Sequence, residues 1–101
     1  MGGRFAELIA RQLDLFEEQD ADFLRRVDEA ERAYDDADRE DAEEIYGRYQ
    51  ELVEHGTEAL AEMRDTYART LESHDADEYI AEFNQTVIDR MPRFGLEIED
   101  L

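Results

Sequence analysis

The feature that most constrains the fold is a long apolar stripe between residues 45 and 71. Its members are separated by 4, 3, 4, 4, 3, 4 and 4 positions: Ile45, Tyr49, Leu52, Gly56, Leu60, Met63, Tyr67 and Leu71. This pattern repeats every eleven residues, a period that keeps one face of a nearly straight α-helix turned the same way. The sequence therefore predicts one long helix over about 40–74. Because the stripe continues through Gly56, we interpret this glycine as a close-contact point, although glycine costs about 1 kcal/mol inside a helix.

Three further segments carry the amphipathic patterns of shorter helices. A first helix over about 4–18 is predicted by an apolar face made of Phe5, Leu8, Ile9, Leu13 and Phe16. A second helix, which Asp20 or Asp22 can cap, is predicted by the heptad spacing of Phe23, Val27, Ala30, Tyr34 and Ala37. A last helix over about 77–91 is predicted by Tyr79, Ile80, Phe83, Val87, Ile88 and Met91.

These patterns define the fold class that we expect. The chain of 101 residues has the length of one domain, and we assign residues 1–91 to a single all-α domain. Its predicted architecture is a small antiparallel helical bundle with one long helix, a shorter preceding hairpin helix, and flanking short N- and C-terminal helices.

The stretch DDADREDAEE, residues 35–44, separates the two central stripes and holds seven carboxylates and one arginine. It permits two interpretations: the solvated middle of one helix over 21–74, or a turn between two helices. In the second, Asp38 caps the long helix, and the acids after it occupy the first turns, where the helix dipole favours negative charge. We favour the turn, because it folds the 23–37 stripe back against the long helix and covers both.

Residues 92–101 form an apolar C-terminal tail. Pro92 ends the preceding helix, and the alternation of Phe94, Leu96 and Ile98 predicts an extended segment that fills a groove. A solvated terminus of this composition is an association hazard. Three positions stay open for it: packing within an oligomer, which we favour, packing on its own chain, or docking on a different protein.

The charge balance excludes several classes of partner. The chain carries 30 acidic residues against 11 basic ones, and its net charge is −19 at pH 7. Nucleic acids and anionic membranes require a cationic surface, so we expect neither as a partner. No apolar run approaches the roughly 18 residues of a membrane-spanning helix, and the N-terminus lacks a signal-peptide pattern. We therefore expect a cytoplasmic location. We attribute the acidic, lysine-free composition to the organism, either through a GC-rich genome in which arginine codons replace lysine codons or through a high-salt cytoplasm.

Motifs for metal binding are incomplete. A calcium loop that began at Asp36 would need glycine at its sixth position and glutamate at its twelfth, where the chain has Asp41 and Gly47. A carboxylate di-metal bundle needs glutamate three residues before its histidines. Leucine stands at that position before both His55 and His74, so neither histidine belongs to this motif.

One stripe of the long helix offers only weak candidates for a metal contact: Glu51, His55, Glu58 and Glu62. At about 100° per residue, this stripe points away from Leu52, Leu60 and Met63, so we expect it to face water. We therefore predict no metal ligands and no cofactor.

The inventory for covalent catalysis is equally thin. The chain has no cysteine, which excludes thiol nucleophiles and disulfides. Its single serine, Ser73, stands beside His74 where a helix cap is expected. We interpret His74 as lying at the C-terminal end of the long helix, where a histidine gains from the helix dipole. We predict no catalytic residues, and we expect that the protein is not an enzyme.

These observations favour a non-enzymatic helical module for protein–protein interaction or assembly, and we expect a homo-oligomer. Its predicted interface combines one face of the long helix with the tail: Tyr49, Leu52, Val53, Phe94, Leu96, Ile98 and Leu101. Two alternatives remain: a carboxylate-rich metal-binding or ferritin-like protein, and an acidic decoy that occupies the basic groove of another protein.

Overall fold

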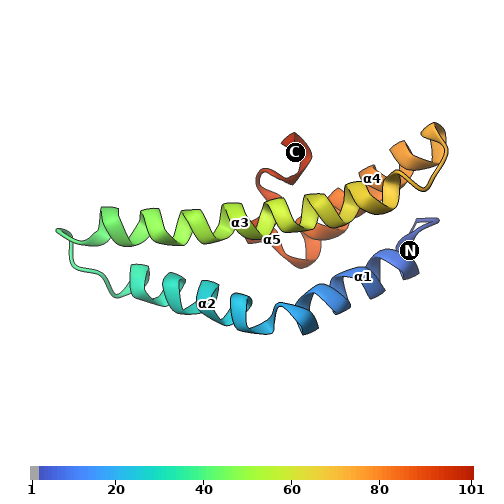
Figure 1. Cartoon of the computed structure of the whole chain (residues 1–101). Helices are drawn as coiled ribbons and strands as arrows, with labels where there is room; N and C mark the ends of the chain where they lie inside the picture. Colours follow the sequence, from blue (N-terminus) through green and yellow to red (C-terminus); the bar gives the residue numbers. More distant parts are fainter. Residues whose placement is uncertain (1–2) are drawn as a thin grey trace.

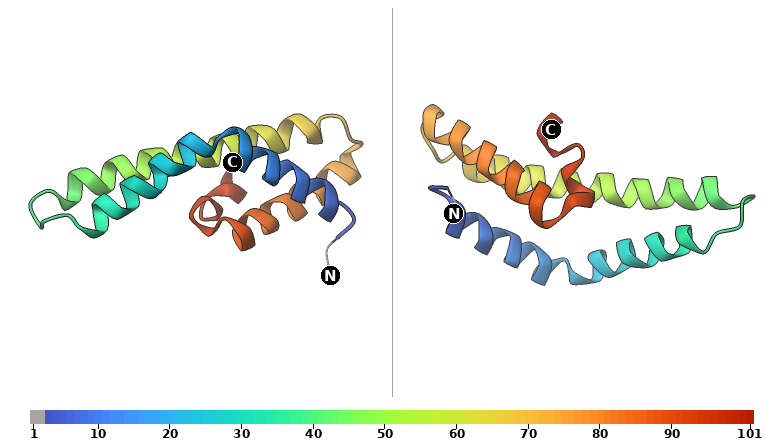
Figure 2. Two further views of the ribbon diagram at one scale, coloured as in Figure 1. Left: turned by 90° about the horizontal axis from the view of Figure 1, so that it is seen from below. Right: turned by 180° about the vertical axis from the view of Figure 1, so that it is seen from behind.

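In a computed structural model that describes residues 3–101, the chain is all-helical (Figure 1). Helices α1 (Ala6–Gln19) and α2 (Ala21–Asp35) follow one another along α3 (Ala42–Ala68), and α4 (Ser73–Arg90) folds back along the C-terminal half of α3. The molecule is elongated, with extents of 51 × 24 × 24 Å. Figure 2 shows α1 and α4 beside the same half of α3. The predicted fold class, a small helical bundle with one long helix, is confirmed.

The acidic stretch forms the turn of a helical hairpin. Helix α2 ends at Asp35 and α3 begins at Ala42, so the interpretation of a turn is confirmed. The carbonyl oxygen of Asp38 accepts hydrogen bonds from the backbone N–H groups of Asp41 and Ala42. Asp41 therefore occupies the N-cap position that we predicted for Asp38. Beyond the turn the two helices pack closely, and α2 contributes Val27 as its buried residue.

The main core lies where α1, α3 and α4 meet. Helix α1 turns its predicted apolar face inward and buries Ile9, Leu13 and Phe16. Across from it, α4 buries Tyr79, Phe83, Asn84 and Val87. Leu60 on α3 is fully buried between these helices. The core at this end of the molecule is therefore enclosed by three helices, α1, α3 and α4.

The tail is helical, and the prediction of an extended segment is wrong. A short helix, α5 (Pro92–Gly95), is followed by a 3₁₀ turn, η1 (Ile98–Asp100). Pro92 ends α4, but it also occupies the first turn of α5, where its fixed φ suits a helix start. Phe94 and Ile98 are four residues apart and both are buried in the core, while Leu96 between them is 86% exposed. A helical spacing of four, and not strand alternation, decides which side chains point inward.

Gly56 is the contact point that the sequence predicted. It is buried within α3, and a Cβ atom at this position would collide with the ring of Phe94. The ring in turn packs edge-to-face against Phe16 at a centroid distance of 6.4 Å. Gly56 therefore creates the space in which the tail packs onto the long helix.

A buried arginine on α3 connects the tail to α3 and α4. Arg64 on α3 is 3% exposed, and its Nη1 donates to Asn84 Oδ1 at 2.8 Å and to the carbonyl oxygen of Ile98 at 2.9 Å. Its Nε donates to Asp65 Oδ1 at 2.9 Å. Because a buried guanidinium is costly unless its donors are satisfied, these contacts fix the position of η1.

The connection between α3 and α4 differs from the prediction. Helix α3 ends at Ala68 and α4 already begins at Ser73, in place of the predicted boundaries near 74 and 77. The backbone N–H groups of Thr70 and Leu71 bond to carbonyl oxygens three residues earlier, which tightens the last turn and ends the helix.

His74 consequently lies in the first turn of α4 and is exposed. The predicted contact of His74 with the dipole of a helix C-terminus is therefore wrong, because the residue lies at the N-terminal end of α4.

Across residues 3–101, no helix combines the length and the apolar composition needed to cross a membrane.

Candidate functional site

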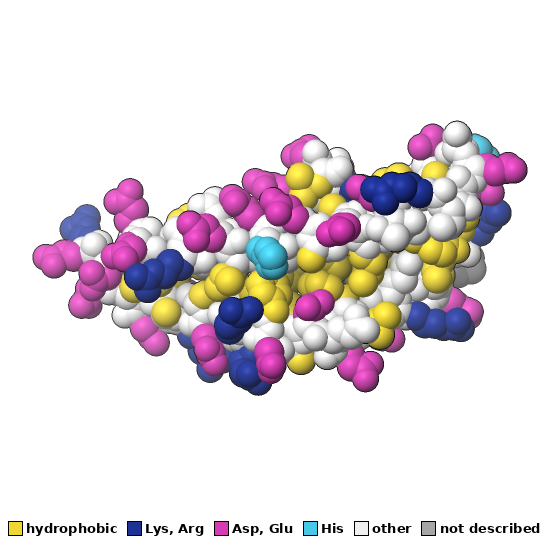
Figure 3. Space-filling model, viewed as in Figure 1, with side chains coloured by type: hydrophobic (Ala, Val, Ile, Leu, Met, Phe, Trp, Pro, Cys, Tyr) yellow, Lys and Arg dark blue, Asp and Glu magenta, His cyan; other side chains and the backbone are white. Residues whose placement is uncertain are grey.

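A hollow with a mostly apolar lining lies between α1 and α3, and we call it the α1–α3 groove. Figure 3 shows hydrophobic side chains gathered in a band between α3 and the helices below it. The groove has a volume of about 530 Å³, and it is lined by Gln12, Leu15, Ala59, Glu62, Met63, Thr66, Tyr67 and Thr70. Leu15 is 46% exposed, and Met63 and Tyr67 are half-buried. Met63 and Tyr67 pack against the core on one side and keep part of their surface exposed.

A tyrosine from α4 holds the two walls of the groove apart. Tyr79 is fully buried, and its ring packs against Phe5 at the start of α1 (5.5 Å between centroids) and against Tyr67 on α3 (4.9 Å). Its hydroxyl donates to Gln12 Oε1 at 2.7 Å. Desolvation by burial raises the pKa of Tyr79 to about 12, so the hydroxyl keeps its proton even above the pKa of about 10 of an exposed tyrosine. The aromatic wedge thus keeps α1 and α3 separated along the groove.

Both walls of the groove follow from helical spacing. On α3, Ala59, Met63 and Thr70 share one side because they are separated by four and seven residues. On α1, Leu15 lies seven residues after Leu8, at an angle different from that of the buried Leu13. Leu15 lies outside the apolar face predicted for this helix, and its spacing of seven residues from Leu8 is the signal in the sequence for this second apolar edge.

The four weak candidates for a metal contact form an exposed stripe on α3, and the last of them reaches the groove. Glu51, His55, Glu58 and Glu62 are all exposed, which confirms that this acidic stripe faces water. Glu62 itself lines the groove beside Met63, and His55 packs edge-to-face on Phe23 of α2 at 5.3 Å. The stripe therefore borders the apolar seam and does not point directly away from it. Among residues 3–101, no group of three His, Asp or Glu side chains has the geometry to hold a metal ion.

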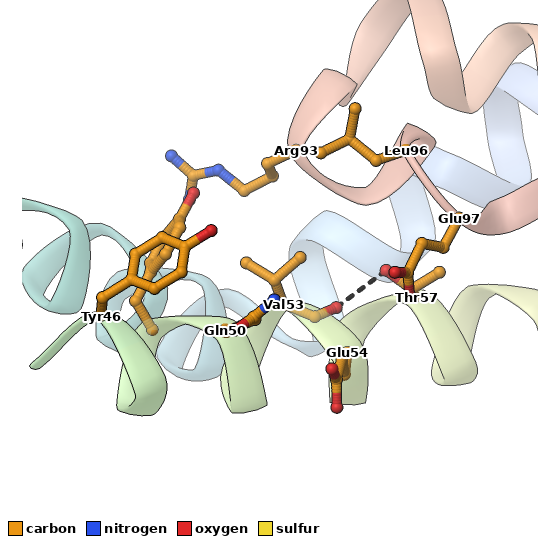
Figure 4. Close-up of a pocket in the computed structure, with 9 residues that line it drawn as sticks. Tyr46, Gln50, Val53, Glu54, Thr57, Arg93, Leu96 and Glu97 are labelled. Atoms are coloured by element: carbon orange, nitrogen blue, oxygen red, sulfur yellow. Dashed lines mark hydrogen bonds between the residues drawn. The ribbon is translucent and has the colours of Figure 1, made fainter. Parts of the chain in front are cut away.

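A second, smaller hollow of about 110 Å³ lies between α3 and the tail, and we call it the tail notch (Figure 4). Its walls include Tyr46, Tyr49 and Val53 from α3, with Arg93 and Leu96 from the tail. Figure 4 shows Arg93 reaching from α5 toward Tyr46, and Leu96 at the edge of the notch. Burial raises the pKa of the Tyr49 hydroxyl, with a further contribution from the charge of nearby Glu31.

Ion pairs on the other side of the tail anchor it, and they border a further hollow of about 510 Å³ whose apolar lining includes Leu24, Tyr49 and Met91. Arg93 donates to Asp28 (2.9 Å) and to Glu31 on α2, and Arg90 pairs with Asp14 and Glu17 on α1. Both arginines therefore link the C-terminal segment to the N-terminal helices. Partly exposed pairs of this kind contribute little stability individually, but they fix the orientation of α4 and α5.

The structure divides the predicted interface residues into two groups. Phe94 and Ile98 lie in the core of their own chain, which removes them from the surface that a second chain could contact. The other members retain exposed area: Tyr49, Leu52, Val53, Leu96 and Leu101. Of these, Tyr49, Val53 and Leu96 are brought together at the tail notch. The α1–α3 groove was not part of the predicted interface.

No family model matches the chain, and the comparisons with curated proteins and with solved structures find no match either. Information about function therefore comes from the geometry and charge of the surface alone.

Proposed function

We propose that this chain is a non-enzymatic protein–protein interaction module that receives its partner in the α1–α3 groove. One observation carries the proposal: Leu15, Met63 and Tyr67 keep exposed area on a single hollow surface. Contiguous apolar surface with a polar border is typical of protein interaction sites. Burying one large apolar side chain is worth roughly 1.5–3 kcal/mol, so a partner that covered several of them would gain a useful affinity.

The side chains around the groove support binding better than catalysis. Glu62 is the one carboxylate among the residues that line it, and the remaining polar lining comes from Gln12, Thr66, Thr70 and the Tyr67 hydroxyl. General acid–base catalysis or nucleophilic attack needs a positioned pair of reactive groups. The lining offers a docking surface with a few hydrogen-bonding groups at its edges, which suits recognition of another protein.

Self-association is a second candidate, supported by a different observation. Leu96 is 86% exposed beside the tail notch, and Leu101 is 51% exposed at the C-terminus. A second copy that covered the notch and these leucines would make a homo-oligomer, as the sequence suggested. Substituting both leucines by glutamine should then lower the mass measured by light scattering without changing the helical circular dichroism. An unchanged mass would contradict self-association through the notch.

A photo-activated cross-linker on the groove edge tests the main proposal. Thr66 is exposed and lines the groove, so a cross-linker at this position should join the chain to a partner protein in an extract of the source cells. Adding Leu15→Gln and Met63→Gln should abolish that product. A cross-linker at Asp36, in the exposed hairpin turn, is the matched control and should give no such product. Equal yields with and without the two groove substitutions would contradict the proposal.

A further inference from the structure

We infer that the partner of the α1–α3 groove is a cationic amphipathic helix. This inference rests on the proposed function, because it names the chemistry of the partner that binds the same groove. Two independent properties of the groove lead to it: the periodicity of its apolar wall and the sign of the charge along its border.

The shape of the groove fits a helix. The α3 wall extends from Ala59 to Thr70, a length of about 16 Å or three helical turns. Its apolar side chains recur with helical spacing, and α1 forms the opposite wall through Leu15 and Gln12. A helix laid between two helices presents anchors three, four and seven residues apart to such walls. Three turns provide three or four anchors, which is the usual number for recognition of this kind.

The charge along the groove selects a cationic partner. Glu58 and Glu62 are exposed, one turn apart, and Glu62 reaches into the lining. Glu51 continues the same stripe toward the hairpin, and Glu18 is exposed on α1 one turn beyond Leu15. Charges of opposite sign at the edge of an apolar contact guide association and fix its register.

The basic residues near the groove do not cancel the negative charge along its border. Arg11 on α1 forms a long, exposed pair with Glu7 (3.9 Å), and Arg69 after the end of α3 is exposed. The carboxylates of Glu18, Glu58 and Glu62 outnumber these two cations. The chain as a whole carries a net charge of −19. Lysine or arginine on the flanks of a docked helix would therefore meet a negative border.

A second copy of this chain is a poorer occupant for the same reason. It brings another net charge of −19, and the flanks of its apolar faces carry carboxylates of their own, such as Glu7 and Glu18 on α1. Like charges set against each other across an interface are costly. The same physical argument excludes an acidic peptide, so the inference commits to a positively charged helix from another protein.

Synthetic peptides provide the probe. The first is a fluorescein-labelled amphipathic helix of leucine and lysine, about 12 residues long to match the groove. The second replaces every lysine with glutamate and keeps the leucine face, and the third scrambles the leucine–lysine sequence so that charge is retained and amphipathicity is lost. Binding to the intact chain is measured by fluorescence anisotropy near 0.15 M salt, where exposed charges are already partly screened.

Matched variants locate the binding site. Leu15→Gln with Met63→Gln should weaken binding of the leucine–lysine peptide about tenfold or more, and Leu96→Gln is the control on a different surface. Glu58→Gln with Glu62→Gln should weaken binding about three- to tenfold. Glu40→Gln with Glu43→Gln, two exposed acids of the hairpin turn and the start of α3, should have no effect. Thr66→Arg, which leaves the core untouched, provides a second groove variant that should also weaken binding.

The outcomes separate this inference from the proposed function. Selective binding of the leucine–lysine peptide, lost in the groove and border variants but not in the controls, supports both. If the acidic peptide binds the groove equally well, the cationic partner is wrong while the groove remains a binding site. If the scrambled peptide binds as tightly, or if all variants bind alike, the peptides are held only by nonspecific attraction between their positive charge and the acidic surface of the chain. That result overturns the inference and removes the support for the groove.

Discussion

The two halves of α3 carry the same apolar stripe but have very different surroundings. From Gly56 to Ala68, the helix packs under α1, α4 and the tail, and all of its buried residues lie here. From Ala42 to His55, none of its residues is buried, and α2 is the helix beside it (Figure 2). We call these regions the packed half and the hairpin half. The side chains Ile45 and Tyr49 remain half-buried, although they occupy the same stripe as Leu60.

This difference shows that an apolar stripe predicts which face of a helix packs against its neighbours, but not how completely the side chains on that face are buried. Two helices can shield only one side of each other, whereas a third layer closes the core. In the packed half, α4 and the tail provide that layer. The same layer creates the functional candidate, because Tyr79 enters between α1 and α3 and leaves the groove beside it. The hairpin half is free to carry a dense acidic surface, since little of it has to be desolvated.

The largest expected effect comes from removing the aromatic ring that closes the packed half. Phe94→Ala should lower the free energy of unfolding by about 3–5 kcal/mol, because it leaves a cavity next to Gly56 and Phe16. Tyr34→Ala, at a 40% exposed tyrosine of α2 that packs on Tyr46 of the hairpin half, should cost about 1 kcal/mol or less. Urea denaturation followed by circular dichroism measures both. Equal losses would mean that the two halves contribute equally to stability.

A pair of arginine substitutions sharpens the comparison. Arg64→Met in the packed half leaves Asn84 Oδ1 without its donor, which should cost about 1–3 kcal/mol. It also removes the shorter of two hydrogen bonds to the Ile98 carbonyl oxygen, which keeps a 3.4 Å bond from the Leu101 N–H. Arg48→Met removes the exposed pair with Glu44 (2.8 Å) in the hairpin half and should change stability by about 0.5 kcal/mol or less. Hydrogen exchange at the C-terminal amides should also quicken in Arg64→Met alone. Unchanged protection there would show that Arg64 does not hold the tail.

Salt should stabilise the whole molecule by a smaller amount. With 30 acidic residues, like-charge repulsion opposes folding, and raising NaCl from about 0.01 M to 1 M shortens the screening length from roughly 30 Å to 3 Å. We expect the melting temperature to rise by about 5 °C, which corresponds to about 1 kcal/mol for a domain of this size. A melting curve that does not respond to NaCl would contradict this account of the charge.

The smallest effect should come from the hairpin turn. Asp35, Asp36 and Asp41 are exposed, so replacing all three by asparagine should change the free energy of unfolding by less than about 1 kcal/mol. Relief of repulsion could make the change favourable. Calorimetric titration with calcium provides the decisive control: micromolar binding to the unmodified chain that the three substitutions abolish would show that the turn is a metal site.

The sequence predicted the features that depend on local periodicity. The helical class, the contact role of Gly56 and the exposure of the acidic stripe follow from spacing along one segment. The hairpin turn, at residues 36–41 in the structure, follows from the need to cover two apolar stripes. The tail could not be predicted in this way, because Phe94, Leu96 and Ile98 fit both a strand and a short helix. Its fold depends on Gly56 and Arg64, which belong to a different helix.

The groove was missed for a related reason. It exists because Tyr79 on α4 separates α1 from α3, and the apolar patterns of α1 and α3 contain no information about that distance. In the sequence, Leu15 was the residue that indicated the groove. A single leucine outside an apolar face does not by itself predict a binding surface, because isolated exposed leucines are common.

Native-state hydrogen exchange along α3 tests the central comparison most directly. The helix is continuous from Ala42 to Ala68, so each of its amides reports on the packing of its own segment and not on a difference in secondary structure. Amides from Leu60 to Ala68 should exchange only through global unfolding, whereas amides from Tyr46 to Val53 should exchange through local opening at a rate at least about 100-fold faster. Uniform protection along the helix would contradict the division into a packed half and a hairpin half.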